Sequence, residues 1–430
     1  MQAAGFVEGY LTAPDIFNHW YNQRWWLSQK TNDTYKVMDW LMQHHTWLRQ
    51  QLDEPANQSS PFWQAMQLVV RQLQGMLDGY NARVSAEGTA LGIDFINLQE
   101  WLTLNTMGRC SALVKIAPDF SDIFVGHATW WTYTSMLKIY KHYTFELQGE
   151  QYKTRTTSMS SYPGSHLVVT ETSNGILDPS VWRQVVPQAA LSWQRVLVAN
   201  WLSDSGAEWA HWIKQYNSGT YNNQYIIVDL KLFSPGAELQ RGLLTIVEQM
   251  PGLVVAADKT QVLQRGYWPS YNIPFFTEVY NKSGYPGLAH RLQAKDESAY
   301  NAVVSGLSYQ LAPRAKISRR DQGDVLSLHQ LKAYMRSNSW ASEPYSGNSP
   351  FGAICSRGDL DPAHPKASGC NDAKVTSYRL AMANAAEAVA GPTAGDGGDL
   401  GVFKWGGKWQ GVAHRGQPEV FDFAYELQQP

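Results

Sequence analysis

Cys110 is the residue whose position most favours nucleophilic chemistry. It lies in the run Arg109-Cys110-Ser111-Ala112-Leu113, where a polar loop passes into an apolar, strand-like stretch. Cleavage of the bond before it would make this cysteine N-terminal, and its new α-amine, with a pKa near neutrality, would be a base beside the sulfur. The alternative interpretation is a buried structural cysteine, which is the commoner fate of a single thiol.

His127 is the second residue that favours chemistry. It ends the second of two predicted strands, 112–116 and 123–128, which the turn residues 118–122 join into a hairpin. The hairpin would return the imidazole to the neighbourhood of the thiol, where it would accept a proton or hold a substrate oxygen. A histidine packed in the core is an equally supported alternative.

The other two cysteines, Cys355 and Cys370, flank a loop rich in Asp, Pro, Ser and Gly. A disulfide could close this loop, and it would leave Cys110 as the unpaired thiol. Such pairing would also indicate an oxidising compartment. Two unpaired thiols remain the alternative.

Composition indicates a globular chain. Its 430 residues are 44% hydrophobic and 17% charged, which suffices for a substantial core in one large domain or in two to three smaller ones. The net charge of −2 disfavours nucleic acid as a partner. No apolar run reaches the roughly 18 residues of a membrane span. The first eight residues lack the features of a signal peptide, so we expect either a cytosolic protein or a chain that begins inside the mature sequence.

Periodicity predicts helices first and strands later. Helical spacing occurs in 20–52, 62–80, 133–143 and 181–201, and strand-like runs follow the hairpin at 166–172, 224–232 and 253–257. Segments 344–372 and 391–401 are rich in turn-forming residues and are predicted to be loops. A mixed α+β sandwich fits this order of elements.

Standard catalytic motifs do not explain the chain. It contains no HExxH, CxxC, P-loop or GxSxG pattern, and no GxGxxG follows a predicted strand. Metalloprotease, zinc-ribbon, nucleotide-binding and serine-lipase interpretations therefore have no support.

A family resemblance covers nearly the whole chain. The sequence resembles the phospholipase B-like proteins in collinear runs: Gly-Arg-Cys-Ser-Ala-Leu-Val-Lys (108–115), Ser-Ser-Tyr-Pro-Gly (160–164), Asn-Ser-Gly-Thr-Tyr-Asn-Asn-Gln (217–224), Val-Glu-Gln-Met-Pro-Gly (247–252), Tyr-Trp-Pro-Ser-Tyr-Asn-Ile-Pro (267–274), Pro-Arg-Ala-Lys-Ile (313–317) and Asp-Ala-Lys-Val-Thr-Ser (372–377).

The resemblance implies an N-terminal nucleophile hydrolase, a single large domain built as a four-layer αββα sandwich. Members are lysosomal or secreted glycoproteins that mature by cleavage before the cysteine. Here the cut at Arg109-Cys110 would leave a mostly helical fragment, 1–109, and a larger one, 110–430. The implied activity is hydrolysis of lipid acyl ester or amide bonds through an S-acyl intermediate on Cys110, without a cofactor or metal.

The resemblance also implies a set of site residues. Besides Cys110 and His127, it places Asn272 and Arg314 in the site, with Trp130 and Ser173 as substrate-binding or supporting residues. Asn272 would donate to an oxyanion. Arg314 would hold the thiolate charged or bind a substrate carboxylate or phosphate. Without the resemblance, a turn asparagine and an arginine in a surface ion pair are the alternatives.

The chain also departs from the family pattern. A segment with an acidic pair, usual in the family, is shortened after Gly164, and the signal peptide and first strands of the family are missing. Three glycosylation sequons, at Asn32, Asn57 and Asn281, favour a secreted protein slightly. The tripeptide at 357–359, Arg-Gly-Asp, lies within the resemblance, which disfavours an integrin-binding role.

A phospholipid or another acyl lipid is the expected partner, with contact to a membrane surface. Two other functions stay open: lipid binding without turnover, and an amidase acting on N-acyl or peptide-like substrates. The sequence also leaves open the head group, the acyl position and length, and the oligomeric state.

Overall fold

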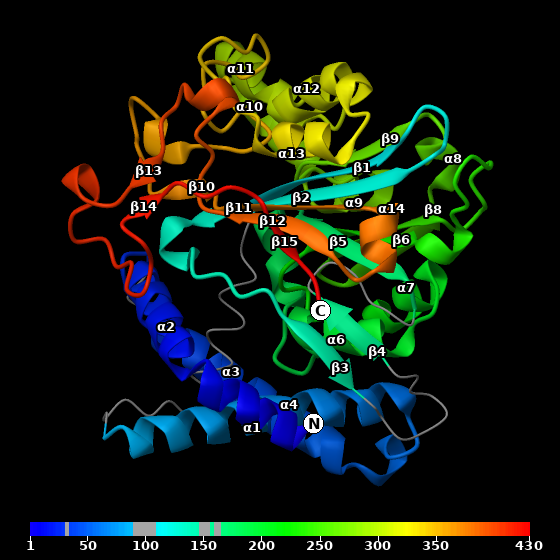
Figure 1. Cartoon of the computed structure of the whole chain (residues 1–430), viewed down its shortest axis with the longest axis vertical. Helices are drawn as coiled ribbons and strands as arrows, with labels where there is room; N and C mark the ends of the chain where they lie inside the picture. Colours follow the sequence, from blue (N-terminus) through cyan, green and yellow to red (C-terminus); the bar gives the residue numbers. More distant parts are fainter. Residues whose placement is uncertain (31–33, 89–108, 146–154, 159–164) are drawn as a thin grey trace.

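Two antiparallel sheets form the centre of the molecule (Figure 1). The computed structural model describes residues 1–30, 34–88, 109–145, 155–158 and 165–430; the family run at 160–164 and the sequon at Asn32 lie outside them. The larger sheet has the order β15-β12-β11-β2-β1-β9, with β10 also paired to β2. The smaller sheet has the order β5-β6-β7-β8.

The strands of the larger sheet are β1 (Arg109–Ile116), β2 (Ile123–Thr132), β9 (Tyr267–Ser270), β10 (Ser368–Cys370), β11 (Asp372–Ser377), β12 (Ala386–Ala390) and β15 (Glu426–Gln428). Those of the smaller sheet are β5 (Leu167–Ser173), β6 (Asn223–Asp229), β7 (Leu244–Met250) and β8 (Leu253–Asp258). Two short ribbons are β3 (His142–Phe145) with β4 (Arg155–Ser158), and β13 (Phe403–Lys404) with β14 (Val420–Phe421).

Side-chain alternation places the two sheets face to face. Val114 and Val125 are paired across β1 and β2, and they share one apolar cluster with Ile226 and Ile246 of the smaller sheet. Successive residues of a strand point to opposite faces of its sheet. The other face of β1 and β2 is therefore turned away from the smaller sheet, and its Leu113 packs in a separate cluster.

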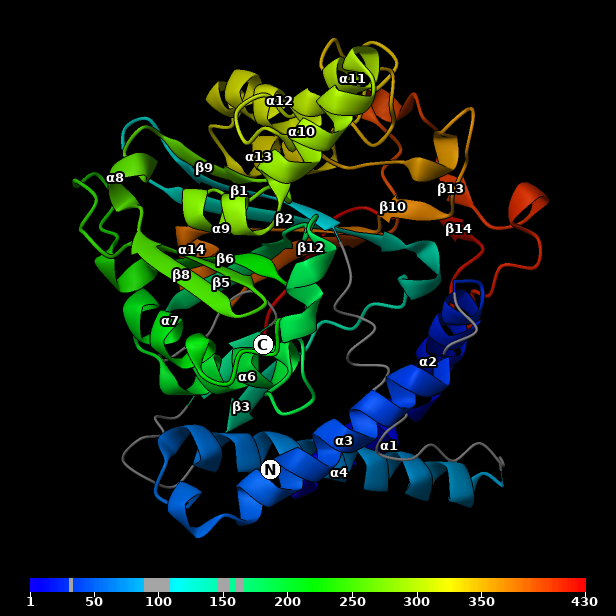
Figure 2. The same cartoon turned by 180° about the vertical axis from the view of Figure 1, so that it is seen from behind.

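Helices cover both outer faces of the sheets (Figure 2). On the larger sheet, α12 (Pro313–Asp321) and α13 (Leu328–Arg336) share a core with Leu113. On the smaller sheet, α6 (Ser192–Leu202) and α7 (Gly206–Lys214) pack against β5, β6 and β7. The predicted mixed α+β fold is confirmed, and its described elements stack in the order helix, sheet, sheet, helix.

The N-terminal helices form a further layer beneath α6 (Figure 1). They are α1 (Gln2–Leu11), α2 (Ala13–Ser28), α3 (Thr34–Asp53) and α4 (Pro61–Ala86). The helix predicted at 20–52 is thus two helices, and the one predicted at 62–80 is longer at its C-terminal end. Pro61 begins α4, as the sequence indicated, because the first turn of a helix needs no donor at that position.

Helices α1 and α4 approach each other through glycines on both sides. A Cβ atom on Gly5 would lie 2.0 Å from the carbonyl oxygen of Gln72, and one on Gly75 would lie 2.0 Å from that of Gln2. Gly9 and Gly79 repeat the contact one turn further along each helix. Only glycine permits this backbone contact, so the two helices are fixed to each other closely.

Two helical predictions were wrong in part. Segment 133–143 forms a single 3₁₀ turn, η2 (Tyr133–Ser135), and then enters β3 instead of continuing as a helix. The Tyr133 hydroxyl donates to Asp359 at 2.9 Å, a tertiary contact that outweighs local periodicity. In 181–201, helix α6 begins only at Ser192, after the 3₁₀ helix η3 (Pro179–Gln184).

The strand predictions were closer. The 112–116 and 123–128 hairpin is confirmed as β1 and β2, and the runs at 166–172 and 253–257 are β5 and β8. The run at 224–232 is β6 followed by the 3₁₀ turn η4 (Leu230–Leu232), which the Asp229 side chain caps. Within the two sheets, strands β7, β9, β10, β11, β12 and β15 were not predicted, and β10 lies in segment 344–372, which was predicted to be a loop.

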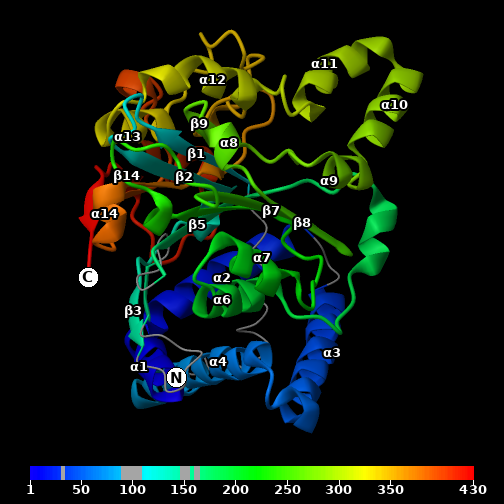
Figure 3. The ribbon, with the colours of Figure 1, turned by 90° about the vertical axis from the view of Figure 1, so that its right-hand side faces the viewer.

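Shorter helices complete the described chain: α8 (Thr260–Leu263), α9 (Thr277–Lys282), α10 (Tyr285–Lys295), α11 (Glu297–Leu307) and α14 (Tyr378–Met382). Figure 3 shows α10 and α11 as a pair at the periphery of the molecule. Over the described ranges, no helix is both long and apolar enough to cross a membrane.

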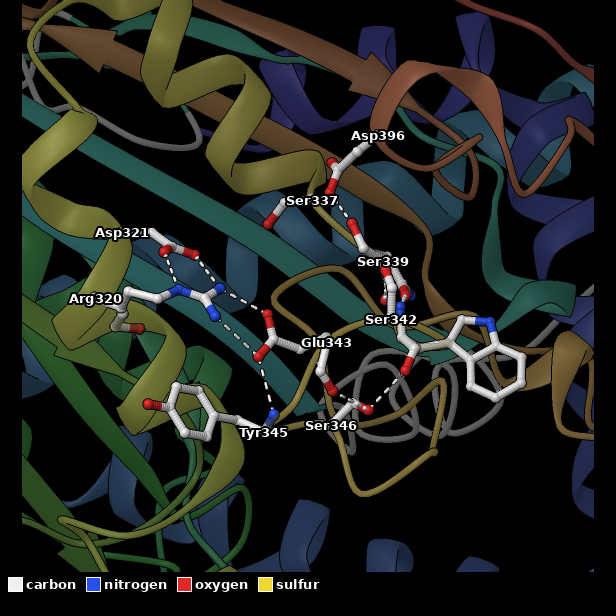
Figure 4. A network of polar contacts seen from close by, with 12 residues as sticks. Arg320, Asp321, Ser337, Ser339, Ser342, Glu343, Tyr345, Ser346 and Asp396 are labelled. Carbon is white, nitrogen blue, oxygen red and sulfur yellow. Dashed lines mark hydrogen bonds and ion pairs between the residues drawn. The ribbon is translucent and has the colours of Figure 1, made fainter.

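An ion-pair network fixes the end of α12 to the loop that follows α13 (Figure 4). Arg320 donates to Asp321 and, through Nη2 at 2.6 Å, to Glu343. The same Glu343 accepts from the backbone N–H of Tyr345 at 2.9 Å. In the neighbouring turn the Ser339 hydroxyl donates to Asp396. This loop leads into the disulfide segment described next.

The disulfide between Cys355 and Cys370 is present, so the alternative of two unpaired thiols is excluded. Within the loop that it closes, Arg357 and Asp359 are only 2% and 3% exposed and pair at 2.8 Å. The Arg-Gly-Asp tripeptide is therefore a buried ion pair with no surface available to a receptor.

Candidate active site

Cys110 is buried near the start of β1, with its side chain completely covered. It is paired with Thr129 on β2, while Ala112 is paired with His127. Since directly paired residues point to the same face, Cys110 and His127 share one face of the larger sheet. The hairpin thus returns His127 to the thiol, as its sequence position suggested.

Glu171 of β5 completes a cluster around the sulfur. Its Oε1 lies 4.0 Å from Cys110 Sγ, and the ligand-type atoms of Cys110, His127 and Glu171 all lie within 4.8 Å of one another. The Tyr221 hydroxyl donates a hydrogen bond to Glu171. Burial raises the pKa of Glu171 to about 7. This residue was not predicted from the sequence, although it stands two positions before Ser173.

Burial keeps the thiol and the imidazole of this cluster neutral in the intact chain. Burial first, and then the nearby Glu171, raises the pKa of the Cys110 thiol well above its ordinary value. Burial also lowers the pKa of His127 to about 3, helped by the positive charge of Lys374. Within the described residues, His127 Nε2 is buried without a hydrogen-bond partner. The imidazole is therefore a neutral base with an unused nitrogen.

Asn272 holds the backbone nitrogen of Cys110. Extending the pairing of β1 with β9 by two residues puts Asn272 opposite Cys110, at a left-handed φ of 71° that asparagine tolerates. Its Oδ1 accepts from Cys110 N–H at 3.3 Å and from Arg314 Nη2 at 2.7 Å. Its Nδ2 donates to the Ser173 carbonyl at 2.7 Å and to the Ser173 hydroxyl at 3.2 Å. Because two donors face the oxygen, the orientation of the amide is determined.

Arg314 holds the other end of the same residue. Located in the first turn of α12 and 9% exposed, it donates from Nη1 to the Cys110 carbonyl at 2.5 Å and to Ser111 Oγ at 3.1 Å. Its Nη2 also donates to the Tyr271 carbonyl at 2.8 Å. Burial and the charge of Arg109 lower its pKa to about 9. The surface ion-pair alternative is excluded, and both Nη atoms are already bonded to protein oxygens.

Trp130 supports this arginine on the face of the larger sheet that is opposite to the Cys110 thiol. The Arg314 guanidinium carbon lies 4.2 Å from the centre of the indole ring. The carbonyl of Ile354 accepts from Trp130 Nε1 at 3.2 Å and from Ser111 Oγ at 2.7 Å. Trp130 is therefore a supporting residue, and the neighbouring disulfide at Cys355 anchors the carbonyl that orients it.

A cavity of about 610 Å³ opens beside His127 and Glu171. That volume lies within the range of pockets that hold small organic ligands. Much of its wall is apolar, as six of its lining residues illustrate: Ile16, Met76, Val125, Leu137, Trp193 and Leu197. It extends from the larger sheet to β5, α6 and the N-terminal helices α2 and α4, and its wall includes His127 and Glu171, the neighbours of the buried thiol, but not Cys110 itself.

Two other features bear on the chemistry. Arg109 is exposed at the first position of β1, so the predicted scissile bond joins an exposed residue to a buried one. Cys110, His127 and Glu171 are also the types that bind zinc, but a tetrahedral site with bonds of about 2.0 to 2.3 Å requires closer donors than a spread of 4.8 Å. The arrangement brings three titratable side chains close together around the thiol.

Comparisons with known proteins agree over the whole length. The profile of the family described as Phospholipase B matches residues 1–427. The chain is similar to Phospholipase B-like 1 of Bos taurus, with 40% identity over 100% of this chain and 82% of that protein. It is 36% identical to Phospholipase B of Crotalus adamanteus and 33% identical to Phospholipase B-like protein D of Dictyostelium discoideum, covering 82% and 81% of those proteins.

Proposed function

This chain belongs to the phospholipase B family, and from that membership we propose that it hydrolyses acyl ester bonds of phospholipids, with Cys110 as an N-terminal nucleophile. The observation that carries the proposal is the hydrogen bond from Cys110 N–H to Asn272 Oδ1, beside a sulfur that faces His127 and Glu171. The layered arrangement of helices and sheets supports assignment to the αββα N-terminal nucleophile hydrolases.

The nucleophile would be formed by cleavage of Arg109-Cys110. The thiol sulfur attacks the Arg109 carbonyl carbon, the C–N bond breaks, and the departing Cys110 nitrogen takes the thiol proton. Water then hydrolyses the resulting thioester, which releases the Arg109 carboxylate and frees the thiol. Asn272 and Arg314 hold the nitrogen and the carbonyl of Cys110 on either side of its Cα, so they fix this residue while the bond changes.

The same residues would then serve turnover. The free α-amine accepts the thiol proton as the sulfur attacks the substrate ester. The acyl C–O bond then breaks and the alcohol leaves with that proton, and water hydrolyses the S-acyl intermediate to a fatty acid and the free thiol. The unpartnered Nε2 of His127 offers a second acceptor within the cluster. Asn272 would serve as an oxyanion donor if one amide proton turned from Ser173 to the substrate. An ester and an amide pass through the same tetrahedral chemistry, so an amidase remains within this mechanism.

The proposed compartment is lysosomal or extracellular. The disulfide between Cys355 and Cys370 is typical of an oxidising environment. Asn281, in one of the sequons, is exposed on α9, and Asn57 is half-buried. Glycosylation of the exposed site would be consistent with passage through the secretory pathway.

Lipid binding without turnover is the second candidate. The complete burial of the Cys110 thiol and its raised pKa favour this role for the uncleaved chain, because a neutral, covered thiol is a poor nucleophile. The apolar cavity exists without cleavage, so lipid binding does not require maturation.

One experiment separates these candidates. The intact mass under denaturing conditions is measured for wild type and Cys110→Ala, together with fatty-acid release from a phospholipid. We expect wild type to yield two fragments and released acid, and Cys110→Ala to remain one 48.4 kDa chain without activity. Cleavage and normal hydrolysis in Cys110→Ala would refute the cysteine mechanism. A wild-type chain that stays whole and binds lipid without hydrolysing it would favour the second candidate.

A further inference from the structure

The cavity wall carries a charged group that the proposed reaction does not use. Asp372 Oδ1 accepts from Lys374 Nζ at 2.8 Å and from the backbone N–H of Thr129 at 3.0 Å. Its Oδ2 lies 3.3 Å from Lys138 Nζ. All four residues line the cavity. Two ammonium groups are thus held around a single carboxylate.

The charges of this group leave a net positive excess. Although burial opposes it, the attraction of Lys374 and Lys138 holds the pKa of Asp372 well below its ordinary value, so this carboxylate is ionised. The neighbouring His127 is neutral near pH 7 because its pKa is about 3. Where the neighbouring Glu171, with a pKa of about 7, is protonated, two lysines and one aspartate present one positive charge in excess, which a singly charged anion would balance.

Both lysines retain hydrogen-bond donors. An ammonium group has three N–H donors. Lys374 directs two of them to Asp372 and to Thr129 Oγ1, the latter at 2.9 Å, whereas Lys138 forms an ion pair with Asp372 at 3.3 Å. Counting only contacts among residues that the structure describes, both side chains keep N–H groups for a ligand. Their exposed fractions of 14% and 32% show partial shielding from water, which strengthens binding of an anion.

The position of the lysine pair relative to the nucleophile fits one part of a phospholipid. Thr129 is opposite Cys110, and Lys374 is opposite His127, so β1, β2 and β11 lie side by side. Two strand spacings, together with the two-residue offset between Thr129 and His127 along β2, amount to about 12 Å between the backbones of the nucleophile and of Lys374. In a glycerophospholipid the few bonds of the glycerol separate the acyl ester from a phosphodiester with one negative charge.

Arg314 is not available for this anion. Its Nη atoms are bonded to the Cys110 and Tyr271 carbonyls, Ser111 Oγ and Asn272 Oδ1, and its guanidinium stacks on Trp130 on the far face of the sheet. The sequence-based expectation that it binds a substrate phosphate therefore lacks support from the geometry. The lysines that line the cavity are Lys141, which is paired with Glu8, and the two lysines Lys138 and Lys374.

We propose that Lys138 and Lys374 bind the phosphodiester of the phospholipid whose acyl ester lies at Cys110. This assignment rests on the proposed function for the class of substrate, and it makes the site selective for phospholipids over neutral acylglycerols. A fatty-acid carboxylate presents the same anionic oxygens, and the test below separates the two sources.

Binding is measured in the Cys110→Ala chain, which cannot turn lipid over. The probes are a short-chain phosphatidylcholine, the diacylglycerol with the same acyl chains, and the matching fatty acid. Each is titrated into the protein while the tryptophan fluorescence is recorded, to which Trp131 and Trp193 of the cavity wall contribute. Adding Lys138→Met should raise the Kd for phosphatidylcholine about tenfold and leave that for diacylglycerol unchanged. The control is Lys332→Met. Lys332 lies on α13, is paired with Glu387, and has a similar exposed fraction of 24%, so its removal should change the Kd of neither lipid.

Other outcomes overturn the assignment. The assignment is wrong if the Cys110→Ala chain does not bind phosphatidylcholine. It is also wrong if Lys138→Met changes the Kd values for phosphatidylcholine and diacylglycerol equally, changes neither, or changes only the Kd for the fatty acid. Lys138→Gln and circular dichroism guard against misfolding. Hydrolysis by the mature wild-type protein is measured separately: its absence would refute the proposed function while the binding comparison still decides the role of the lysines.

Discussion

Arg314 donates a 2.5 Å hydrogen bond from Nη1 to the carbonyl oxygen of Cys110. The arginine thus binds the backbone of the nucleophile, whereas other residues surround its sulfur. Its partner on the nitrogen side is Asn272, whose Oδ1 accepts from both Cys110 N–H and Arg314. The result is a closed set of hydrogen bonds around one residue, built from β1, α12 and the turn after β9.

The first prediction concerns the arginine fork. Arg314→Lys keeps the charge but cannot reach the Cys110 and Tyr271 carbonyls, Ser111 and Asn272 together, because a lysine is a single point donor. We expect a loss of about 2 kcal/mol or more in the free energy of unfolding. Cleavage at Arg109-Cys110 should slow at least tenfold. Chemical denaturation and the time course of fragment formation measure the two effects.

The matched control for Arg314 is Arg195 of α6. It is also fully buried and donates to protein oxygens, including the Ala190 carbonyl at 2.9 Å and Gln249 Oε1 at 2.8 Å. Arg195→Lys should cost similar stability but leave cleavage of the folded chain unchanged. Equal slowing of cleavage in both variants would reduce the role of Arg314 to general stability.

The second prediction concerns pH. Glu171 has a pKa of about 7 in the folded chain against an ordinary value of 4.5. Between these values the folded state binds more protons than the unfolded state, so this group makes stability fall as pH rises through the window. Glu171→Gln removes the effect. The stability of the variant relative to wild type should therefore increase by about 3 kcal/mol from pH 4 to pH 8.

His127 supplies the opposite sign and serves as the control. Its pKa is about 3 when folded and 6.5 ordinarily, so the unfolded state binds more protons in that window and stability rises with pH. His127→Gln should remove this rise, so the variant loses stability relative to wild type as pH increases. Urea unfolding of both variants across the range measures the two slopes. Slopes of the same sign would contradict the assigned protonation states.

Local sequence patterns predicted half of this site. The hairpin of β1 and β2 follows from two alternating strands and a short turn, so Cys110 and His127 are neighbours for local reasons. Asn272 is 162 residues from Cys110 along the chain, and no periodicity indicates that β9 pairs with β1. Its place, like that of Arg314, came from the family resemblance alone.

Tertiary contacts explain what the sequence analysis missed. Glu171 is one acidic residue in a strand, and its role depends on β5 lying against β1, a contact between two sheets. Lys374 and Asp372 lie on β11, whose six residues alternate between polar and apolar types but do not by themselves indicate that the strand pairs with β2. Segment 133–143 has helical spacing, but the hydrogen bond from Tyr133 to Asp359 and the pairing of β3 with β4 decide its structure.

The third prediction concerns the disulfide. Cys355 and Cys370 close a loop with a sequence separation of 15, for which removal of the bond should cost about 3 kcal/mol of stability. The loop also carries the Ile354 carbonyl that accepts from Trp130 and Ser111. Cys355→Ala with Cys370→Ala should therefore lower both Tm and the rate of maturation. A lower Tm with unchanged maturation would show that Ile354 is held by other contacts.

The fourth prediction concerns the amide that holds the nitrogen of the nucleophile. Asn272→Ala removes the acceptor of Cys110 N–H and the donor to Ser173, and it places alanine at a φ of 71°. Asn384→Ala makes the same change at a φ of 58° in a turn between α14 and β12, so it has a matched cost in backbone strain. Both variants should lose about 1 kcal/mol of stability or more.

Only Asn272→Ala should lose cleavage, about a hundredfold, and, in any chain that is cleaved, turnover as well. Mass spectrometry of the fragments and ester hydrolysis per cleaved chain measure the two steps separately. Normal maturation with reduced turnover would assign Asn272 to the oxyanion, whereas loss of maturation with normal turnover in the residual cleaved chains would assign it to positioning the Cys110 nitrogen.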